Sequence, residues 1–278
     1  MTKPLLHPDT ARDLEGISDA LPHAIGIYGD HGTGLTTTAK YIAERVGASF
    51  EIVYPERQDS VDIDKGTITI DIIRRLYRVT QGKEKKARCI VITNADTMSP
   101  EAQNAFLKLL EEPTKNITFV LLIHNKDSIL PTVWSRLQRH RIRQITDEQS
   151  EQLLTTLGVS DTSKRRQLLF LAKGLPALLT RLSQNEKAFN DEADLLRQAR
   201  TFIQGTQYER LLICHSVRDS RDKALRMTQY AMSLLKFDIT TRQLADDNHL
   251  ELLNKLELAL QKLANNANIR LALAEAIL

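Results

Sequence analysis

A glycine-rich loop near the start of the chain constrains the fold more than any other feature. Residues 24–28 form a short apolar run, and the sequence Gly-Asp-His-Gly-Thr-Gly-Leu-Thr follows at residues 29–36. Apolar residues then recur at helical spacing until Gly47, which is suited to ending a helix. A loop between a strand and a helix can turn its backbone N–H groups toward the oxygens of a phosphate. The segment therefore predicts a phosphate loop or, without a ligand, a plain glycine turn.

Apolar runs and helical patterns alternate along the first half of the chain. The runs that predict strands are residues 24–28, 50–54, 87–92 and 117–123. A helical stripe fills residues 68–79, and Ser99 followed by Pro100 and Glu101 marks the start of another helix, which Pro113 ends. Strands that alternate with helices are typical of a parallel, doubly wound sheet. We therefore expect an α/β domain over residues 1–146.

The pattern changes near residue 146, where Thr146 and Gln149 form a possible capping box. Glycines close two helices after this point, and Pro176 opens a third. From about residue 187 onward there is no strand signal, and apolar stripes at helical spacing continue to the end. These features predict a small helical domain over residues 147–186 and an all-α domain over residues 187–278.

Composition excludes several classes of protein. The 278 residues carry a net charge of +3, with 42% hydrophobic and 26% charged residues, which is an ordinary globular balance. Cys89 and Cys214 cannot form a disulfide framework. The strongest apolar run, residues 118–123, is far shorter than the roughly 18 residues that span a bilayer. We expect a cytoplasmic protein without a membrane segment or signal peptide.

The predicted loop departs from a competent nucleotide site at one decisive position. The loop residues with candidate contacts to a nucleotide are Gly29, Gly32, Gly34, Leu35 and Thr36. Thr36 has a hydroxyl suited to magnesium, but Leu35 stands where a lysine would reach the β- and γ-phosphates. Lys40 lies a full turn, about 5–6 Å, further along the helix. Weak binding of ATP or ADP by the backbone remains possible, and hydrolysis is not expected.

A second departure follows the strand at residues 87–92. A hydrolysing site needs carboxylates there, for magnesium and for orienting water, but Thr93 and Asn94 are neutral. Asp96 lies three residues past the first expected position and is better interpreted as a capping or turn residue. The lost lysine and the lost acids give one consistent interpretation, in which nucleotide hydrolysis has been given up.

Two longer segments carry a resemblance to a known family. Residues 95–113, Ala-Asp-Thr-Met-Ser-Pro-Glu-Ala-Gln-Asn-Ala-Phe-Leu-Lys-Leu-Leu-Glu-Glu-Pro, resemble the AD-x-M-x-x-x-A-x-N-A-L-L-K-x-L-E-E-P signature of bacterial sliding-clamp loader subunits, which are AAA+ proteins. Residues 125–138 resemble their N-(x)-L-L-P-T-I-x-S-R-C-Q segment, and residues 22–24 match the P-H-A before their phosphate loop. Order and spacing agree from about residue 20 to residue 140.

The departures make the chain similar to the delta prime group of these subunits, whose ATP site is weakened or absent. The resemblance implies that residues 147–186 are a helical lid and residues 187–278 a collar for oligomerisation. It implies that Arg136 is an arginine finger acting in trans on a neighbouring subunit's ATP site and that Asn125 is sensor-like. The implied partners are gamma/tau-like motor subunits, a delta-like subunit, the sliding clamp and primed DNA.

Two features depart from the family pattern as well. Residues 54–65 contain no cysteine where bacterial relatives usually carry a four-cysteine zinc module, so no zinc or other metal is expected. The lid's sensor arginine, expected shortly after a glycine, is missing from residues 174–178, Gly-Leu-Pro-Ala-Leu. A subunit that does not sense its own nucleotide would lack this arginine.

Two alternatives to the non-hydrolysing loader subunit stay open. One is an AAA+ ATPase with an unorthodox loop, in which Lys40 and Asp96 supply the missing groups. The other is a stand-alone DNA-binding AAA+ relative. A basic cluster, comprising Arg136, Arg139, His140, Arg141 and Arg143, is either a solvated face with the finger or a phosphate contact. Aromatic residues make up 5% of the chain and are not interleaved with this cluster, so base stacking is not expected.

Overall fold

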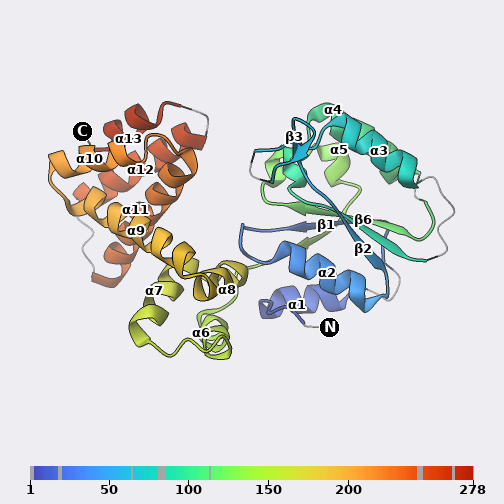
Figure 1. Ribbon diagram of the computed structural model, residues 1–278, viewed down its shortest axis with the longest axis horizontal. Coiled ribbons are helices and arrows are strands. Elements are labelled where there is room, and N and C mark those ends of the chain that lie inside the picture. Colours follow the sequence, from blue (N-terminus) through green and yellow to red (C-terminus); the bar gives the residue numbers. More distant parts are fainter. Residues whose placement is uncertain are drawn as a thin grey trace. The chain divides into compact units, whose positions relative to one another are not determined.

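A five-stranded parallel sheet organises the first part of the protein (Figure 1). The computed structural model describes residues 3–17, 21–63, 65–80, 86–112, 114–242, 247–264 and 267–277. The sheet has the strand order β2-β5-β6-β1-β7. Its strands are β1 (Ala24–Tyr28), β2 (Ser49–Val53), β5 (Arg88–Ile92), β6 (Ile117–Ile123) and β7 (Gln138–Arg141). The expected α/β class, with a parallel sheet followed by helices, is confirmed.

Alternate residues of each strand point to opposite faces, and helices cover both. On one face α3 (Ile70–Thr80), α4 (Pro100–Glu111) and α5 (Pro131–Trp134) share a core with Phe119 and Leu121 of β6. On the other, α1 (Pro8–Glu15) and α2 (Leu35–Arg45) pack against Val120 and Leu122 (Figure 1). Every residue of β6 is buried, as expected for a strand covered by helices on both sides.

The predicted strands lie within one residue of those observed, but two features were missed. β7 reads Gln-Arg-His-Arg, and only His140 is buried, so it carries almost no apolar signal. A short antiparallel hairpin, β3 (Glu56–Arg57) with β4 (Ser60–Val61), was also missed. The α4 helix starts after its Ser99 cap as predicted and ends at Glu111, while Pro113 lies outside the described residues.

Three helices follow the sheet: α6 (Asp147–Thr156), α7 (Thr162–Ala172) and α8 (Pro176–Gln184). The capping box of Thr146 and Gln149 is confirmed, with both reciprocal hydrogen bonds present. Gly174 has a φ of 76°, and its carbonyl accepts a hydrogen bond from the Ile145 N–H at 2.8 Å. The turn before α8 is thereby attached to the segment that leaves β7.

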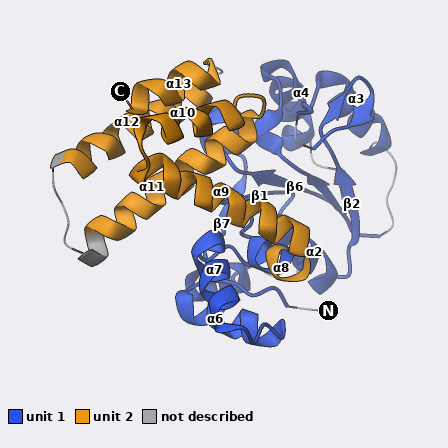
Figure 2. Ribbon diagram, turned by 60° about the vertical axis from the view of Figure 1, so that its left-hand side comes forward, with its two compact units in different colours: residues 1–181 blue, residues 182–278 orange. Residues whose placement is uncertain are grey.

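The chain divides into two compact units, residues 1–181 and residues 182–278 (Figure 2). In the second, α9 (Glu186–Gln204), α10 (Gln207–Ser216), α11 (Arg221–Arg242), α12 (Asp247–Ala264) and α13 (Ile269–Ile277) surround their own apolar core. The predicted division at residues 146 and 186 is finer than these two units and stays a prediction. Within the described ranges, no helix combines the length and apolar character needed to cross a membrane.

Candidate functional site

The glycine-rich loop leaves β1 and enters α2, as the sequence predicts. The Gly29 N–H donates to the Ile123 carbonyl at 3.1 Å, and a methyl group on Gly29 would lie 2.5 Å from the Ile142 carbonyl oxygen. Gly34 caps α2 with a φ of 90°, in the left-handed region that glycine adopts without strain. The Thr33 hydroxyl donates to the Asp30 carbonyl at 2.7 Å and closes the turn. The loop backbone is thus fixed by its own packing.

The position that lacks the lysine belongs to the hydrophobic core. Leu35 is 4% exposed and packs with residues of α1, α2 and the sheet. Thr36 is exposed at the start of the helix. Lys40, the candidate substitute, has its ammonium 3.9 Å from the Glu44 carboxylate on the outer face of α2. Neither position 35 nor Lys40 therefore supplies a positive charge to the loop.

Two histidines that the sequence analysis did not select lie beside the loop. The rings of His31 and His124 are stacked, with centroids 3.5 Å apart, and His124 Nδ1 lies 3.0 Å from the Gly29 carbonyl oxygen. Burial lowers the pKa of His31, as does the nearby His124 charge, while Asp96 and Asp30 act in the opposite direction. Each histidine immediately follows a strand or lies within the loop, and that placement was the available signal. Among the described residues, no three His, Cys, Asp or Glu side chains form a candidate metal site.

The first turn of α8 covers the loop on another side. The Ala177 N–H donates to the Gly32 carbonyl at 2.9 Å. A methyl group on Gly32 would lie 3.2 Å from Leu178 Cβ and 3.3 Å from Leu175 Cβ, so both leucines lie against this glycine. The sensor arginine was expected in this turn, and apolar side chains stand there instead.

The remaining nucleotide-site positions make local hydrogen bonds. The Thr93 N–H and hydroxyl both donate to the Val53 carbonyl, at 3.0 and 3.1 Å, and tie β5 to β2. The Asn94 side chain donates to the Ile63 carbonyl at 3.0 Å. Asp96 lies within the short 3-10 helix Ala95–Thr97, whose N-cap is Asn94, and it accepts a hydrogen bond from the His124 N–H at 3.1 Å. Asn125 caps the short 3-10 helix after β6, accepting from a backbone N–H at 3.1 Å.

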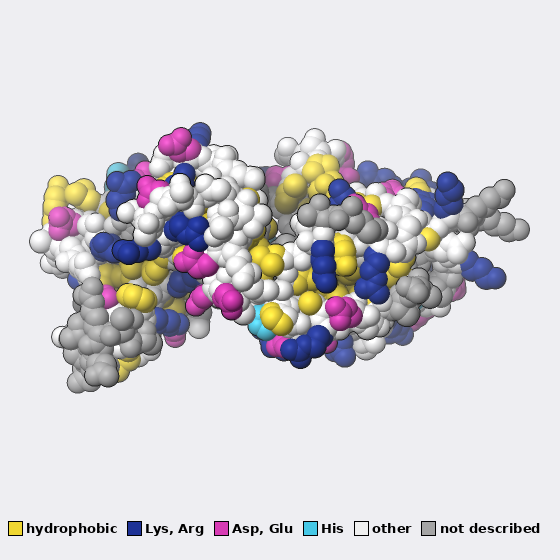
Figure 3. Space-filling view, turned by 90° about the horizontal axis from the view of Figure 1, so that it is seen from below, with side chains coloured by type: hydrophobic (Ala, Val, Ile, Leu, Met, Phe, Trp, Pro, Cys, Tyr) yellow, Lys and Arg dark blue, Asp and Glu magenta, His cyan; other side chains and the backbone are white. Residues whose placement is uncertain are grey.

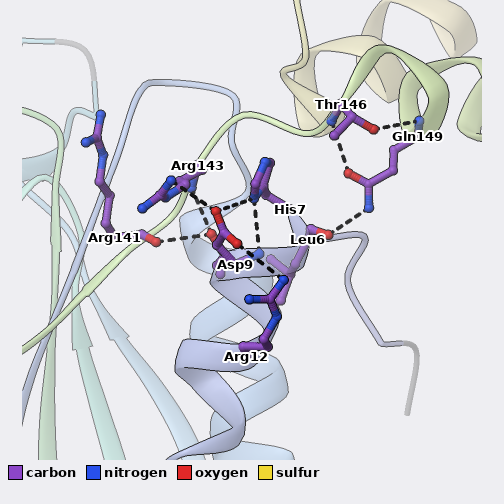
Figure 4. Close-up of polar contacts among 9 residues, drawn as sticks. Leu6, His7, Asp9, Arg12, Arg141, Arg143, Thr146 and Gln149 are labelled. Carbon is purple, nitrogen blue, oxygen red and sulfur yellow. Dashed lines mark hydrogen bonds and ion pairs between the residues drawn. The ribbon is translucent and has the colours of Figure 1, made fainter.

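Residues 6–10 form hydrogen bonds with the connection between β7 and α6 and with α6 itself (Figure 4). Thr10 is buried, and its hydroxyl donates to the Arg141 carbonyl at 3.2 Å and accepts from the Arg143 N–H at 3.1 Å. The Gln149 side chain, which completes the α6 capping box, donates to the Leu6 carbonyl at 2.9 Å. Residues 6–10 therefore hold the segment through which the small helices follow the sheet.

Arg136 lies apart from the loop, in the turn between α5 and β7. Its Nη1 donates to the Thr132 carbonyl at 2.9 Å, and its Nη2 donates to Oε1 of Glu111 at 2.7 Å. The side chain is 38% exposed. Ser135 is the C-cap of α5, and its hydroxyl donates to the same Thr132 carbonyl. The structure thus presents a guanidinium at the surface, anchored to two helices.

The predicted basic cluster around Arg136 is divided among different partners. The Arg139 guanidinium lies 5.5 Å from the centre of the Trp134 ring, and Arg143 pairs with Asp9 at 3.1 Å. His140 is buried and belongs to the interior. On the described part of the face drawn in Figure 3, basic side chains lie among acidic and hydrophobic ones and form no large area of one charge. The phosphate-contact alternative for this cluster stays a prediction.

A buried glutamine connects α4 to the segment that leads to Arg136. Gln103 is 2% exposed, and its Nε2 donates to the Ser128 carbonyl at 2.9 Å. Its Oε1 accepts from the Leu130 N–H at 2.7 Å, directly before α5. Sequence reasoning missed this residue, although a polar side chain beside the apolar stripe of α4 was a visible signal. Gln103 fixes the start of α5 relative to α4.

Comparisons with known proteins agree with this geometry. The family model for the DNA polymerase III delta subunit matches residues 48–146. Replication factor C subunit 5 of Homo sapiens is 32% identical over 134 residues, 47% of this chain and 38% of that protein. Replication factor C subunit 3 of Saccharomyces cerevisiae is 28% identical over 184 residues, 63% of this chain and 52% of that protein. Part of this chain is therefore similar to a DNA polymerase III delta subunit family and to replication factor C subunits.

Over most of the chain, the similarity to solved structures is one of fold. The crystal structure of a DNA polymerase III gamma subunit-related protein from Thermotoga maritima covers 96% of this chain and 95% of its own, at 19% identity and a TM-score of 0.53. The matches to the two replication factor C subunits span about half of those proteins or less. The resemblance seen in the sequence is therefore confirmed as a similarity over part of the chain, and the fold likeness extends over most of it.

Proposed function

We propose that this chain is a delta prime-type subunit of a sliding-clamp loader, which acts in DNA replication without hydrolysing ATP itself. Its similarity to replication factor C subunits and to a DNA polymerase III family supports the loader assignment. One contrast carries the rest of the proposal. Leu35 fills the lysine position as a core residue, while Arg136 stands at the surface after α5.

Arg136 acts on a neighbouring motor subunit. An arginine finger stabilises the charge that develops on a transferring phosphoryl group, and related fingers contribute about 10³–10⁵ in rate. The planar guanidinium offers five donors in a fork that matches phosphate oxygens. Because its own loop lacks a cation and is covered by α8, the subunit contributes to catalysis only in trans. Any binding of ATP or ADP by its loop is weak.

The second unit supplies the collar through which the subunit joins motor and delta-like subunits. Several of its large apolar side chains are exposed, and α10 presents Tyr208 at 71%, Leu211 at 46% and Leu212 at 50% exposure. Spacings of three and four residues place these side chains on one side of the helix. Such a stripe is suited to burial against a partner helix. The assembled complex opens the clamp and loads it on primed DNA in the cytoplasm.

Two measurements test this function. The isolated chain should hydrolyse ATP no faster than a buffer blank. In a complex reconstituted with motor subunits, Arg136→Ala should assemble normally but lower the ATPase rate that clamp and DNA stimulate. Arg139→Ala is the matched control, because this nearby exposed arginine stacks on Trp134 and has no proposed contact with phosphate.

Three results would contradict the proposal. Magnesium-dependent turnover by the isolated chain that disappears in Asp96→Asn would favour the unorthodox ATPase. Equal losses of activity and DNA binding in Arg136→Ala and Arg139→Ala would make the cluster a DNA contact. Failure to co-purify with any motor subunit would favour a stand-alone DNA-binding protein.

A further inference from the structure

We propose that Glu111 is a positioning residue for Arg136, with a carboxylate that holds the guanidinium where it meets the neighbouring subunit's phosphates. The inference rests on the finger function proposed above. Its basis is the pair of contacts that fix the guanidinium. Nη2 donates to the Glu111 carboxylate at 2.7 Å, and Nη1 donates to the Thr132 carbonyl at 2.9 Å.

The two anchors come from different, well-packed helices. Glu111 is the last residue of α4, whose Phe106 is fully buried, and Thr132 belongs to α5, whose Val133 is fully buried. The helices that carry both anchors are therefore fixed by the core. An arginine side chain without anchors samples many rotamers and loses this freedom when it docks. Holding it in advance lowers the entropic cost of placing the finger.

The anchored guanidinium keeps donors free for a phosphate. Of its five N–H groups, one on Nη1 and one on Nη2 are used by the two anchors. The Arg136 side chain is 38% exposed and that of Glu111 is 52% exposed, so the pair is open to solvent. Glu111 can therefore stay bound while Arg136 contacts a partner.

The size of the two interactions shows whether Glu111 orients Arg136 or keeps it away from a phosphate. An exposed ion pair shifts an equilibrium by no more than about fivefold, because water and salt screen the charges. An arginine finger contributes about 10³–10⁵ in rate. A contact as weak as the exposed pair cannot withhold Arg136 from a phosphate that binds it strongly. What Glu111 supplies is orientation.

The test uses the reconstituted complex and measures kcat and KM for ATP in the presence of clamp and DNA. Glu111→Ala should lower kcat by about two- to fivefold, the range of an exposed pair, and leave KM unchanged. Glu111→Gln should keep most of the rate, because its amide oxygen accepts the same hydrogen bond. The control is Glu112→Ala: Glu112 is exposed and ends α4 through its backbone N–H, so this variant should match the wild type.

The Arg136→Ala background decides whether Glu111 acts through the finger. There, Glu111→Ala should have no further effect. A further loss in that background, an unchanged rate in Glu111→Ala alone, or a faster rate in both Glu111 variants would each overturn the inference. If Arg136→Ala itself leaves the rate of an assembled complex unchanged, the finger function fails and the inference fails with it. That result is distinct from the other three.

Discussion

A Leu35→Lys variant tests why the phosphate loop has no cation. Leu35 is 4% exposed and packs in the core between α2, α1 and the sheet. Burying a leucine side chain contributes about 1.5–3 kcal/mol, and truncating one to alanine costs about 2–5 kcal/mol. A lysine keeps its methylene groups against the apolar surface but must bring its ammonium out to water. We expect the free energy of unfolding to fall by about 2–3 kcal/mol, without any gain of ATP hydrolysis.

The chain has one tryptophan, which makes the stability measurement specific to the α/β unit. Trp134 packs edge-on against Tyr28, with ring centroids 5.3 Å apart, so its fluorescence reports the unfolding of this unit in urea. Leu35→Met is the matched control, because a hydrophobic change of similar volume costs less than about 1.5 kcal/mol. ATP binding and turnover are measured on the same three proteins.

One result would refute the reasoning about position 35. If Leu35→Lys unfolds at the same urea concentration as the wild type and binds ATP with micromolar affinity, the side chain at this position faces the loop. Weak ATP binding by the wild type would then have a single cause, the missing lysine. If stability falls and ATP binding stays weak, the first turn of α8 and the core together exclude the nucleotide.

Two further predictions concern buried polar side chains. Gln103→Leu should lower the free energy of unfolding by about 2–3 kcal/mol, because two backbone groups of residues 128–130 lose their hydrogen bonds. A decrease of less than about 0.5 kcal/mol, measured by urea unfolding, would contradict this prediction. His140 should make the protein less stable as the pH falls below 6.5, because burial lowers the pKa of its ring and only the unfolded chain then takes up the proton. The urea midpoint should fall between about pH 7.5 and about pH 5. His140→Gln should reduce the dependence of the midpoint on pH. The dependence that remains comes from His23 and His31, because burial lowers the pKa of both side chains. Equal slopes in both proteins would contradict the assignment to His140.

The parts of the fold that were predictable are those where burial is continuous. β6 is buried along its whole length, so its apolar run matches the strand residue for residue. β7 lies at the edge of the sheet and has one buried residue in four, so the sequence carries no run to detect. α1 begins at Pro8, with a His7 cap that is not among the usual capping residues. Edge strands and short capped helices depend on partners that sequence periodicity does not reveal.

The candidate site also has parts that the sequence predicts and parts that it does not. The loop and the missing lysine position were predicted from order and spacing, and Arg136 was selected from the resemblance to clamp-loader subunits. Their surroundings were not, because the contacts join segments far apart in the chain. The hydrogen bond from Ala177 to Gly32 and the stacking of His31 on His124 have no local signal. Whether a loop of this kind is open to a ligand depends on such contacts.

These contacts give the glycine-rich loop packing roles that do not depend on a nucleotide. Gly29 is needed because the Ile142 carbonyl approaches it closely, and Gly32 gives its carbonyl to the first turn of α8. Both positions therefore have packing roles that do not require phosphate. The residues that could replace the missing groups are engaged as well, Lys40 with Glu44 and Asp96 with the backbone of His124. A hydrolysing site built from these residues would have to break both interactions and displace the first turn of α8, whereas the Arg136 side chain already lies at the surface.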